Sequence, residues 1–209
     1  MKIALFDIDG TLIRGPSMEK LLTWHLLKRR FISPGDLARF AAGLLSNGGM
    51  ETTRMHLRGK PAGELEVLAR ECYEILVRPR ILSGARELVE SHLEKGELVV
   101  LLTGSLEVIA RWVKAELGAH GLIASHLEVS GGILTGRLDP PRPFGPRKLM
   151  LARAIAGELG IELGECYAYG DRLSDAPLLA CVGYPRAVNP DPALATLARQ
   201  MGWPVIHLR

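Results

Sequence analysis

The sequence predicts an α/β protein built on a doubly wound, mostly parallel sheet, with an inserted helical domain and a small β-hairpin flap. Short apolar runs typical of buried strands alternate with amphipathic helical patterns from residue 83 onward, and one further run lies at residues 3–6. Residues 16–81 show helical periodicity without strand-like alternation. We therefore expect one domain formed by residues 1–15 and 82–209, and a helical domain formed by residues 16–81.

The composition is that of an ordinary globular protein. The 209 residues are 47% hydrophobic and 23% charged, which argues against disorder, and the net charge is +3. This small charge weakly favours anionic small substrates, and the basic residues lack the aromatic interleaving of a nucleic-acid binder. Three distant cysteines indicate neither a disulfide framework nor a metal site, and no apolar run approaches the roughly 20 residues that span a bilayer. We expect a cytoplasmic protein that binds neither nucleic acid nor membrane.

The first predicted strand ends in two aspartates. A D-I-D-G-T run from Asp7 to Thr11 follows the apolar residues 3–6, and the period of two in a strand points Asp7 and Asp9 the same way. Two carboxylates this close repel each other unless a cation or a shared proton compensates them. Mg²⁺ prefers hard oxygen ligands of this kind, together with water and substrate phosphate, so we predict a magnesium site here. The alternative is that both aspartates are turn or N-cap residues after a core strand.

The inserted segment, residues 16–81, is expected to be a small helical bundle. One helix begins at Pro16 and Ser17 and runs through Arg30, a second begins at Pro34, and a third carries an apolar stripe from Leu65 to Leu76. Glycines and Asn47 separate the second helix from a short segment near residues 50–58.

Two groups of side chains in the inserted segment allow more than one interpretation. The aromatic residues near its apolar stripes are expected in the bundle core rather than in a stacking platform: Trp24, Phe31 and Phe40. The basic residues after the second helix are interpreted as a solvated face, with contact to an anionic substrate as the alternative: Arg54, Arg58 and Lys60.

From Ser83 the chain alternates helices and strands. The predicted strands and loops are a strand at 98–102, a short strand near 122–124, a hairpin over 127–138, a proline-rich loop over 140–146, and strands at 166–169, 184–188 and 204–208. The strand at 98–102 stops at Thr103-Gly104-Ser105, where Ser105 is expected to cap the next helix, the alternative being a phosphate contact.

Four polar groups are therefore expected at one edge of the sheet, because ligands bind outside the carboxyl ends of parallel strands. They are Asp7 with Asp9, the run that begins at Thr103, Lys148 on the helix after the proline-rich loop, and Asp171 with Asp175 after the strand at 166–169. A carboxylate can attack phosphorus if Mg²⁺ and a lysine cancel the repulsion between the two anions. The ordered set thus supplies the parts of a phosphoryl-transfer site.

This ordered set resembles the haloacid dehalogenase-like hydrolases over essentially the whole chain. Asp7 to Thr11 is similar to the first motif of the family, Thr103 to its second, Lys148 to its third, and Gly170-Asp171 with Asp175 to its fourth. The inserted segment looks like the type I cap of the phosphoserine phosphatase branch, and the sheet looks like the Rossmann-like core of the family.

The resemblance implies a role for each site residue. Asp7 would be the nucleophile that becomes an aspartyl phosphate, and Asp9 would protonate the leaving group and later activate water. Mg²⁺ would be held by Asp7, Asp171, the backbone carbonyl of Asp9 and Asp175, the last through water or as an orienter of Lys148. The phosphoryl oxygens would be bound by Thr103 and Gly104 and neutralised by Lys148.

Asp9 decides between reactions within this family. A departing alkoxide needs a proton but a departing halide does not, so an acid at this position favours phosphate-ester chemistry over dehalogenation. We expect a Mg²⁺-dependent phosphatase of a small phosphorylated metabolite, acting as a monomer or homodimer. The alternatives are a phosphotransferase or phosphomutase that uses the same aspartyl phosphate, and a non-catalytic phosphate-binding protein.

Two positions depart from the pattern of the family. Phosphoserine phosphatases carry a glutamate shortly after the first motif, but Gly15-Pro16 stands near that position and the nearest acid is Glu19, which argues against L-phosphoserine. Arg172 replaces the small residue that usually follows the aspartate of the fourth motif, and we expect its side chain to point outward.

Overall fold

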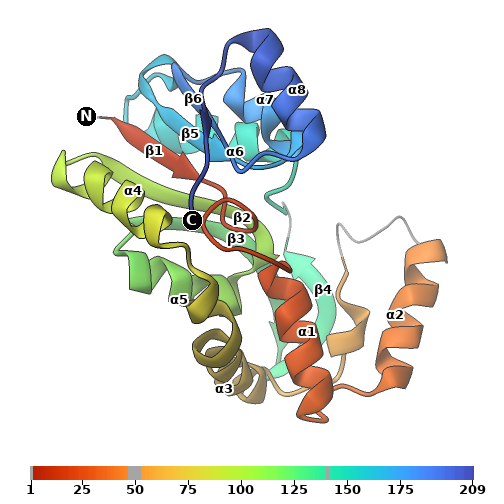
Figure 1. The fold of residues 1–209 in the computed structure, drawn as a ribbon. Helices are drawn as coiled ribbons and strands as arrows, with labels where there is room; N and C mark the ends of the chain where they lie inside the picture. The colour runs from red at the N-terminus through yellow and green to blue at the C-terminus, as the bar shows by residue number, and fades with distance from the viewer. Residues whose placement is uncertain (1, 47–52, 140–141) are drawn as a thin grey trace.

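One seven-stranded sheet organises the computed structural model, which describes residues 2–46, 53–139 and 142–209 (Figure 1). The strand order is β4-β3-β2-β1-β5-β6-β7, and every neighbouring pair is parallel except β3 with β4. The strands are β1 (Ile3–Phe6), β2 (Leu98–Leu106), β3 (Gly121–Ser130), β4 (Ile133–Asp139), β5 (Tyr167–Gly170), β6 (Tyr184–Val188) and β7 (Val205–Ile206). This topology confirms the predicted doubly wound fold class.

The helices cover the two faces of the sheet and fill the insertion. They are α1 (Met18–Lys28), α2 (Pro34–Ser46), α3 (Ala62–Cys72), α4 (Ser83–Glu94), α5 (Glu107–Leu117), α6 (Pro146–Glu158), α7 (Ala176–Leu179) and α8 (Pro192–Met201). Single turns complete the set: η1 (Met55–Leu57), η2 (Tyr73–Val77), η3 (Arg78–Arg80), η4 (Leu163–Glu165) and η5 (Leu173–Asp175).

Alternation along the central strands makes both faces of the sheet apolar. In β1, Ala4 and Phe6 pack into one cluster with α4 and α5, while Ile3 and Leu5 pack into the other with α6, α7 and α8. Burying a side chain such as Phe6 contributes about 1.5–3 kcal/mol relative to leaving it exposed, so such strands are strongly fixed in register. The central strand therefore carries the residues after it to a defined place.

The inserted segment shares its hydrophobic core with the first of these faces. Met18 and Leu22 of α1 and Leu65 of α3 belong to the same buried cluster as Phe6 and Val113. Ser17 caps α1 by accepting a hydrogen bond from the backbone of Lys20 at 3.4 Å. Figure 1 shows α1, α2 and α3 at the end of the molecule away from β6 and α8. The division into two domains stays a prediction.

Residues 53–62 of the inserted segment run beside β4. The backbone nitrogen of Arg54 donates to the carbonyl of Gly136 at 2.7 Å, and that of Gly59 donates to the carbonyl of Leu134 at 2.9 Å. In return the backbone nitrogen of Leu134 donates to the carbonyl of Lys60, also at 2.9 Å. The β3–β4 hairpin is thereby fixed to the inserted segment by main-chain hydrogen bonds.

Several details of the sequence prediction need correction. The expected short strand near 122–124 and the first arm of the hairpin are one continuous strand, β3. The strand expected to stop at residue 102 continues through Leu106, because Leu106 pairs again with Ser125 of β3 beyond an irregularity in the register after Leu102. The expected segment near 50–52, the expected break at 47–49 and the start of the proline-rich loop at 140–141 lie outside the described residues.

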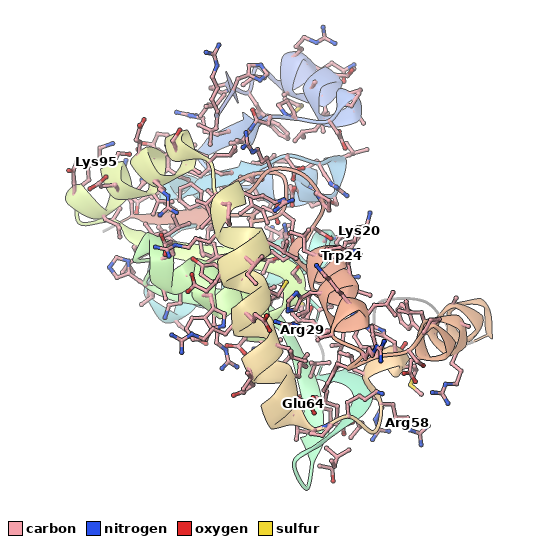
Figure 2. The ribbon with its side chains drawn as sticks, turned by 60° about the horizontal axis from the view of Figure 1, so that its bottom comes forward. Lys20, Trp24, Arg29, Arg58, Glu64 and Lys95 are labelled. Atoms are coloured by element: carbon pink, nitrogen blue, oxygen red, sulfur yellow. The ribbon has the colours of Figure 1, made fainter. Side chains whose placement is uncertain are left out.

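Two side-chain assignments in the inserted segment are also wrong. Trp24 is 52% exposed on the outer side of α1, where Lys28 lies over its ring, so it is not a core residue (Figure 2). Arg54 was expected on a solvated face together with Arg58, but Arg54 is fully buried and forms an ion pair with Glu19. Arg58 is exposed as expected (Figure 2). The amphipathic pattern placed Trp24 near an apolar stripe without fixing which edge it occupies, and the charge of Arg54 indicated exposure because its partner Glu19 lies 35 residues away.

Within the described residues, no helix combines the length and the apolar character that crossing a bilayer requires.

The contact between the hairpin and the inserted segment depends on Gly136. Its backbone φ is +82°, and a Cβ there would lie 2.9 Å from the Cβ of Arg58. We predict that Gly136→Ala lowers the free energy of unfolding by about 1–3 kcal/mol, measured by urea denaturation, because it adds a clash to backbone strain. Gly132→Ala is the matched control, since Gly132 has φ of +80° and open space around it. Equal losses in the two variants would show that the close contact is unimportant.

Candidate active site

The register of the central strands determines which residues lie side by side at the end of the sheet. Phe6 at the end of β1 pairs with Leu101 of β2 and with Tyr169 of β5. Asp7 follows directly, and its backbone nitrogen donates to the carbonyl of Tyr169 at 3.0 Å. Thr103 follows Leu101 by two residues, and Asp171 follows Tyr169 by two. The side chains of Asp7, Thr103 and Asp171 therefore meet at the carboxyl edge of the sheet.

Lys148 connects two of the acidic groups. Its ammonium nitrogen lies 2.5 Å from Oδ1 of Asp7 and 2.7 Å from Oδ1 of Asp175, and all three residues are buried. Lys148 is near the start of α6, 141 residues from Asp7 in the sequence but beside it in space. The lysine thus holds the carboxylate at the end of β1 to the turn that follows β5.

Three carboxylates form a cluster suited to a hard divalent cation. Oxygens of Asp7, Asp171 and Asp175 lie within 4.8 Å of one another, and the three residues are buried. One lysine between them leaves an excess of negative charge, and a set of oxygen donors is what Mg²⁺ prefers. Gly10 makes room for this cluster, since a Cβ there would lie 2.0 Å from Oδ2 of Asp171.

The pKa values of the cluster reflect its burial and this excess of charge. Burial raises the pKa of Asp7 well above its usual value, against the opposing effect of Lys148. Burial and then the charge of Asp175 raise the pKa of Asp171 to about 6. Burial alone would lower the pKa of Lys148, but the carboxylates of Asp7 and Asp175 outweigh it and raise that pKa. Without a cation, the site therefore favours an additional proton on its carboxylates.

Asp9 points to a different set of partners. Its Oδ1 accepts a hydrogen bond from the backbone nitrogen of Met18 at 2.7 Å. Its Oδ2 accepts from the hydroxyl of Ser105 at 2.6 Å and from that of Thr103 at 3.3 Å. Burial raises the pKa of Asp9, and the hydrogen bond from Ser105 is the strongest opposing effect. Asp9 therefore joins the end of β1 to β2 and to the first turn of the inserted segment.

Gly104 lies between the two hydroxyl residues of β2. Its carbonyl accepts hydrogen bonds from the hydroxyl of Ser125 at 2.9 Å and from Nε of Arg142 at 3.2 Å. A Cβ at Gly104 would meet the guanidinium of Arg142 at 3.4 Å. The turn expected to bind phosphoryl oxygens is thus held from β3 on one side and from the loop before α6 on the other.

Comparison with known proteins agrees with this arrangement. A family model described as haloacid dehalogenase-like hydrolase matches residues 4–180. This chain belongs to the haloacid dehalogenase-like hydrolases.

Several relatives of this hydrolase carry phosphatase names. The protein named phosphoserine phosphatase SerB1 of Mycobacterium tuberculosis (strain ATCC 25618 / H37Rv) is 32% identical over 217 residues, which cover 99% of this chain and 70% of that protein. The protein named histidinol-phosphatase of Neisseria meningitidis serogroup C (strain 8013) is 29% identical, and the alignment covers 99% of both chains. The predicted resemblance and the predicted class of enzyme, a hydrolase of this superfamily, are confirmed.

Solved structures show the same fold. A protein of unknown function from Bordetella pertussis Tohama I superposes with a TM-score of 0.84 and 28% identity, covering 98% of this chain and 97% of that one. A substrate-bound phosphoserine phosphatase superposes with a TM-score of 0.68 and 20% identity, covering 98% and 92%. At that identity the second likeness supports the fold alone.

The hydrolase brings together every residue that the sequence placed at its site. Asp7, Lys148, Asp171 and Asp175 form one cluster, and Asp9 and Thr103 contact each other beside Gly104. Their individual roles stay predictions. Arg172 is largely exposed, as expected, yet its Nε lies 3.5 Å from Oδ2 of Asp171.

Some contributors to the site were missed or misassigned from the sequence. Ser105 was expected to cap the following helix, but Leu106 is the N-cap residue of α5 and the hydroxyl of Ser105 bonds Asp9 instead. Ser105 and Thr103 are two residues apart in a strand, and this spacing predicts that their side chains lie on the same face of the sheet. Behind the site, Nε2 of His92 lies 2.8 Å from the hydroxyl of Tyr169, and its Nδ1 contacts Glu97. No sequence motif indicates this second network.

The carboxylate cluster predicts an unusual dependence of stability on pH. Asp171 titrates near 6 when folded but near 4 when unfolded, so between these values the folded hydrolase binds more protons. The free energy of unfolding of metal-free protein should therefore fall as the pH rises from about 4 to about 6. Thermal unfolding in EDTA at about pH 4.5 and about pH 7 should show this loss, and Asp171→Asn should show a smaller one. The same loss in both proteins would exclude Asp171 as its source.

Proposed function

We propose that this hydrolase is a Mg²⁺-dependent phosphatase that cleaves a small phosphomonoester through an aspartyl phosphate on Asp7. The observation that carries the proposal is the placement of one buried carboxylate, Asp7, against both a lysine and a carboxylate cluster suited to a divalent cation. A nucleophilic carboxylate needs this neutralisation before an anionic phosphate can approach it.

In the first half of the reaction, an oxygen of Asp7 forms a bond to phosphorus as the bond from phosphorus to the ester oxygen breaks. Lys148 on Oδ1 and the hydroxyl of Thr11, 3.3 Å from Oδ2, hold the attacking carboxylate in place. Asp9 donates its proton to the departing ester oxygen, which leaves as an alcohol. Thr103 and Gly104, at the end of β2, hold the phosphoryl oxygens.

In the second half, Asp9 accepts a proton from water as the water oxygen bonds to phosphorus. The bond between phosphorus and Asp7 breaks, inorganic phosphate forms, and both carboxyl groups return to their first state. A Mg²⁺ ion held by Asp7, Asp171, the carbonyl of Asp9 and Asp175 would neutralise phosphoryl charge in both halves. Besides the metal ion, the ammonium group of Lys148 supplies positive charge at the site.

The proposed substrates are small organic phosphates. The inserted segment lies directly over Asp9, because the backbone nitrogen of Met18 bonds its carboxylate. Glu19, the nearest acid to the position where a phosphoserine phosphatase would carry a glutamate, forms an ion pair with the buried Arg54. A carboxylate engaged in this way is not free to bind a substrate amino group, which continues to argue against L-phosphoserine.

A panel of phosphorylated metabolites tests the proposal. Wild-type protein with Mg²⁺ should release inorganic phosphate from at least one member, and EDTA should abolish the release until Mg²⁺ is restored. Asp7→Asn should lower kcat by about 10³-fold or more, a barrier increase of about 4 kcal/mol, because an amide is a poor nucleophile toward phosphorus. Asp139→Asn, an exposed position, is the control with unchanged kcat.

Two outcomes would count against the proposal, one against the nucleophile and one against hydrolysis. Full activity in Asp7→Asn would remove the assigned nucleophile. Transfer of the phosphoryl group to an added alcohol, without release of inorganic phosphate, would indicate the phosphotransferase instead.

A further inference from the structure

We propose that Ser105 is a positioning residue for Asp9, and that its hydroxyl holds Oδ2 of that carboxyl group in place. This inference rests on the proposed function, since it concerns the group that protonates the leaving oxygen. It adds to the site a residue, Ser105, that lies outside the four motifs of the family.

The two oxygens of Asp9 have chemically different partners. Oδ1 faces the backbone nitrogen of Met18 at 2.7 Å, a group that can only donate a hydrogen bond. This N–H group holds Oδ1 from the side of the inserted segment. Oδ2 faces two hydroxyl groups, and a hydroxyl group can either donate or accept.

Hydroxyl partners suit a group that gains and loses a proton in each cycle. When Asp9 is ionised, Ser105 donates to Oδ2. When Oδ2 carries a proton, the Ser105 hydroxyl can rotate and accept from it, so neither state leaves a buried polar atom without a partner. The Ser105 hydroxyl can therefore hold Oδ2 in both states that the proposed reaction requires.

Ser105 rather than Thr103 is the main partner. Its hydroxyl is 2.6 Å from Oδ2, against 3.3 Å for that of Thr103, and its side chain is buried at 4% exposure. The backbone nitrogen of Ser105 also donates to the hydroxyl of Thr103 at 3.0 Å. Removing the Ser105 hydroxyl would leave Oδ2 with one longer contact and freedom to turn.

The dependence of rate on the leaving group separates this role from a structural one. The nitrophenolate of p-nitrophenyl phosphate leaves without a proton, while the ethoxide of ethyl phosphate needs one. Ser105→Ala should therefore lower kcat/KM for ethyl phosphate about tenfold more than for p-nitrophenyl phosphate. Ser105→Thr, which keeps the hydroxyl, should restore the wild-type ratio of the two values.

Matched variants guard against an effect of folding. Ser125→Ala removes another buried hydroxyl, which bonds Gly104 and not Asp9, and should lower both kcat/KM values by the same factor. Ser105→Cys keeps the side-chain volume with a weaker donor and should give a selective loss smaller than that of Ser105→Ala. Circular dichroism should show that each variant is folded.

Equal losses on both substrates in Ser105→Ala and Ser105→Cys would overturn the inference while leaving the phosphatase proposal intact, provided that Asp7→Asn is inactive. A wild-type protein that releases phosphate from neither ester and from no member of the metabolite panel would reject the proposed function and this inference with it. A selective loss in Ser125→Ala equal to that in Ser105→Ala would also overturn it, since the effect would then belong to the turn as a whole.

Discussion

The buried ammonium group of Lys148 between Asp7 and Asp175 is the interaction on which the rest of the site depends. It joins the end of the central strand to the turn after the neighbouring strand, inside an edge that also holds Asp171. Removing one partner of a buried ion pair costs about 3–5 kcal/mol, because the other charge is left without compensation. The same charge that holds these carboxylates in place also prepares one of them to meet an anionic phosphate.

A second connection runs through Asp9, which joins the sheet to the inserted segment. One carboxylate oxygen is held by β2 and the other by the first residue of α1. The inserted segment is in turn bound to the β3–β4 hairpin and shares the apolar core of one sheet face. The position of the proposed acid therefore depends on the packing of elements that carry no motif, which explains how a helical insertion can influence chemistry at a strand end.

The sequence determined the sheet and its acidic edge with few errors, because both follow from local rules. The apolar run before Asp7 and the alternation of strands and helices require a buried parallel sheet, and parallel strands bring their carboxyl ends together. Lys148 was placed at this edge by its position at the start of a helix and then by the resemblance to a family, since nothing in a helical pattern says which lysine turns inward.

The misassigned residues share a physical cause. Ser105 has two possible hydrogen-bond partners, a helix end and a carboxylate 96 residues away, and only the tertiary structure decides between them. Arg54 lies fully buried because Glu19, from α1, compensates its charge. Trp24 lies at the edge of an apolar stripe whose other positions are covered. Each depends on a contact between elements that a pattern along the chain does not contain.

The central claim is that Asp7 becomes covalently phosphorylated during turnover. Its most direct test is to quench the enzyme in acid during turnover of a substrate found in the panel, reduce the acyl phosphate with borohydride, and map the modified residue by mass spectrometry. Borohydride reduces an aspartyl phosphate to homoserine, so the account predicts homoserine at position 7 in the quenched enzyme and aspartate there in a control without substrate. Unmodified aspartate at position 7 in both samples, with phosphate released at the normal rate, would contradict it.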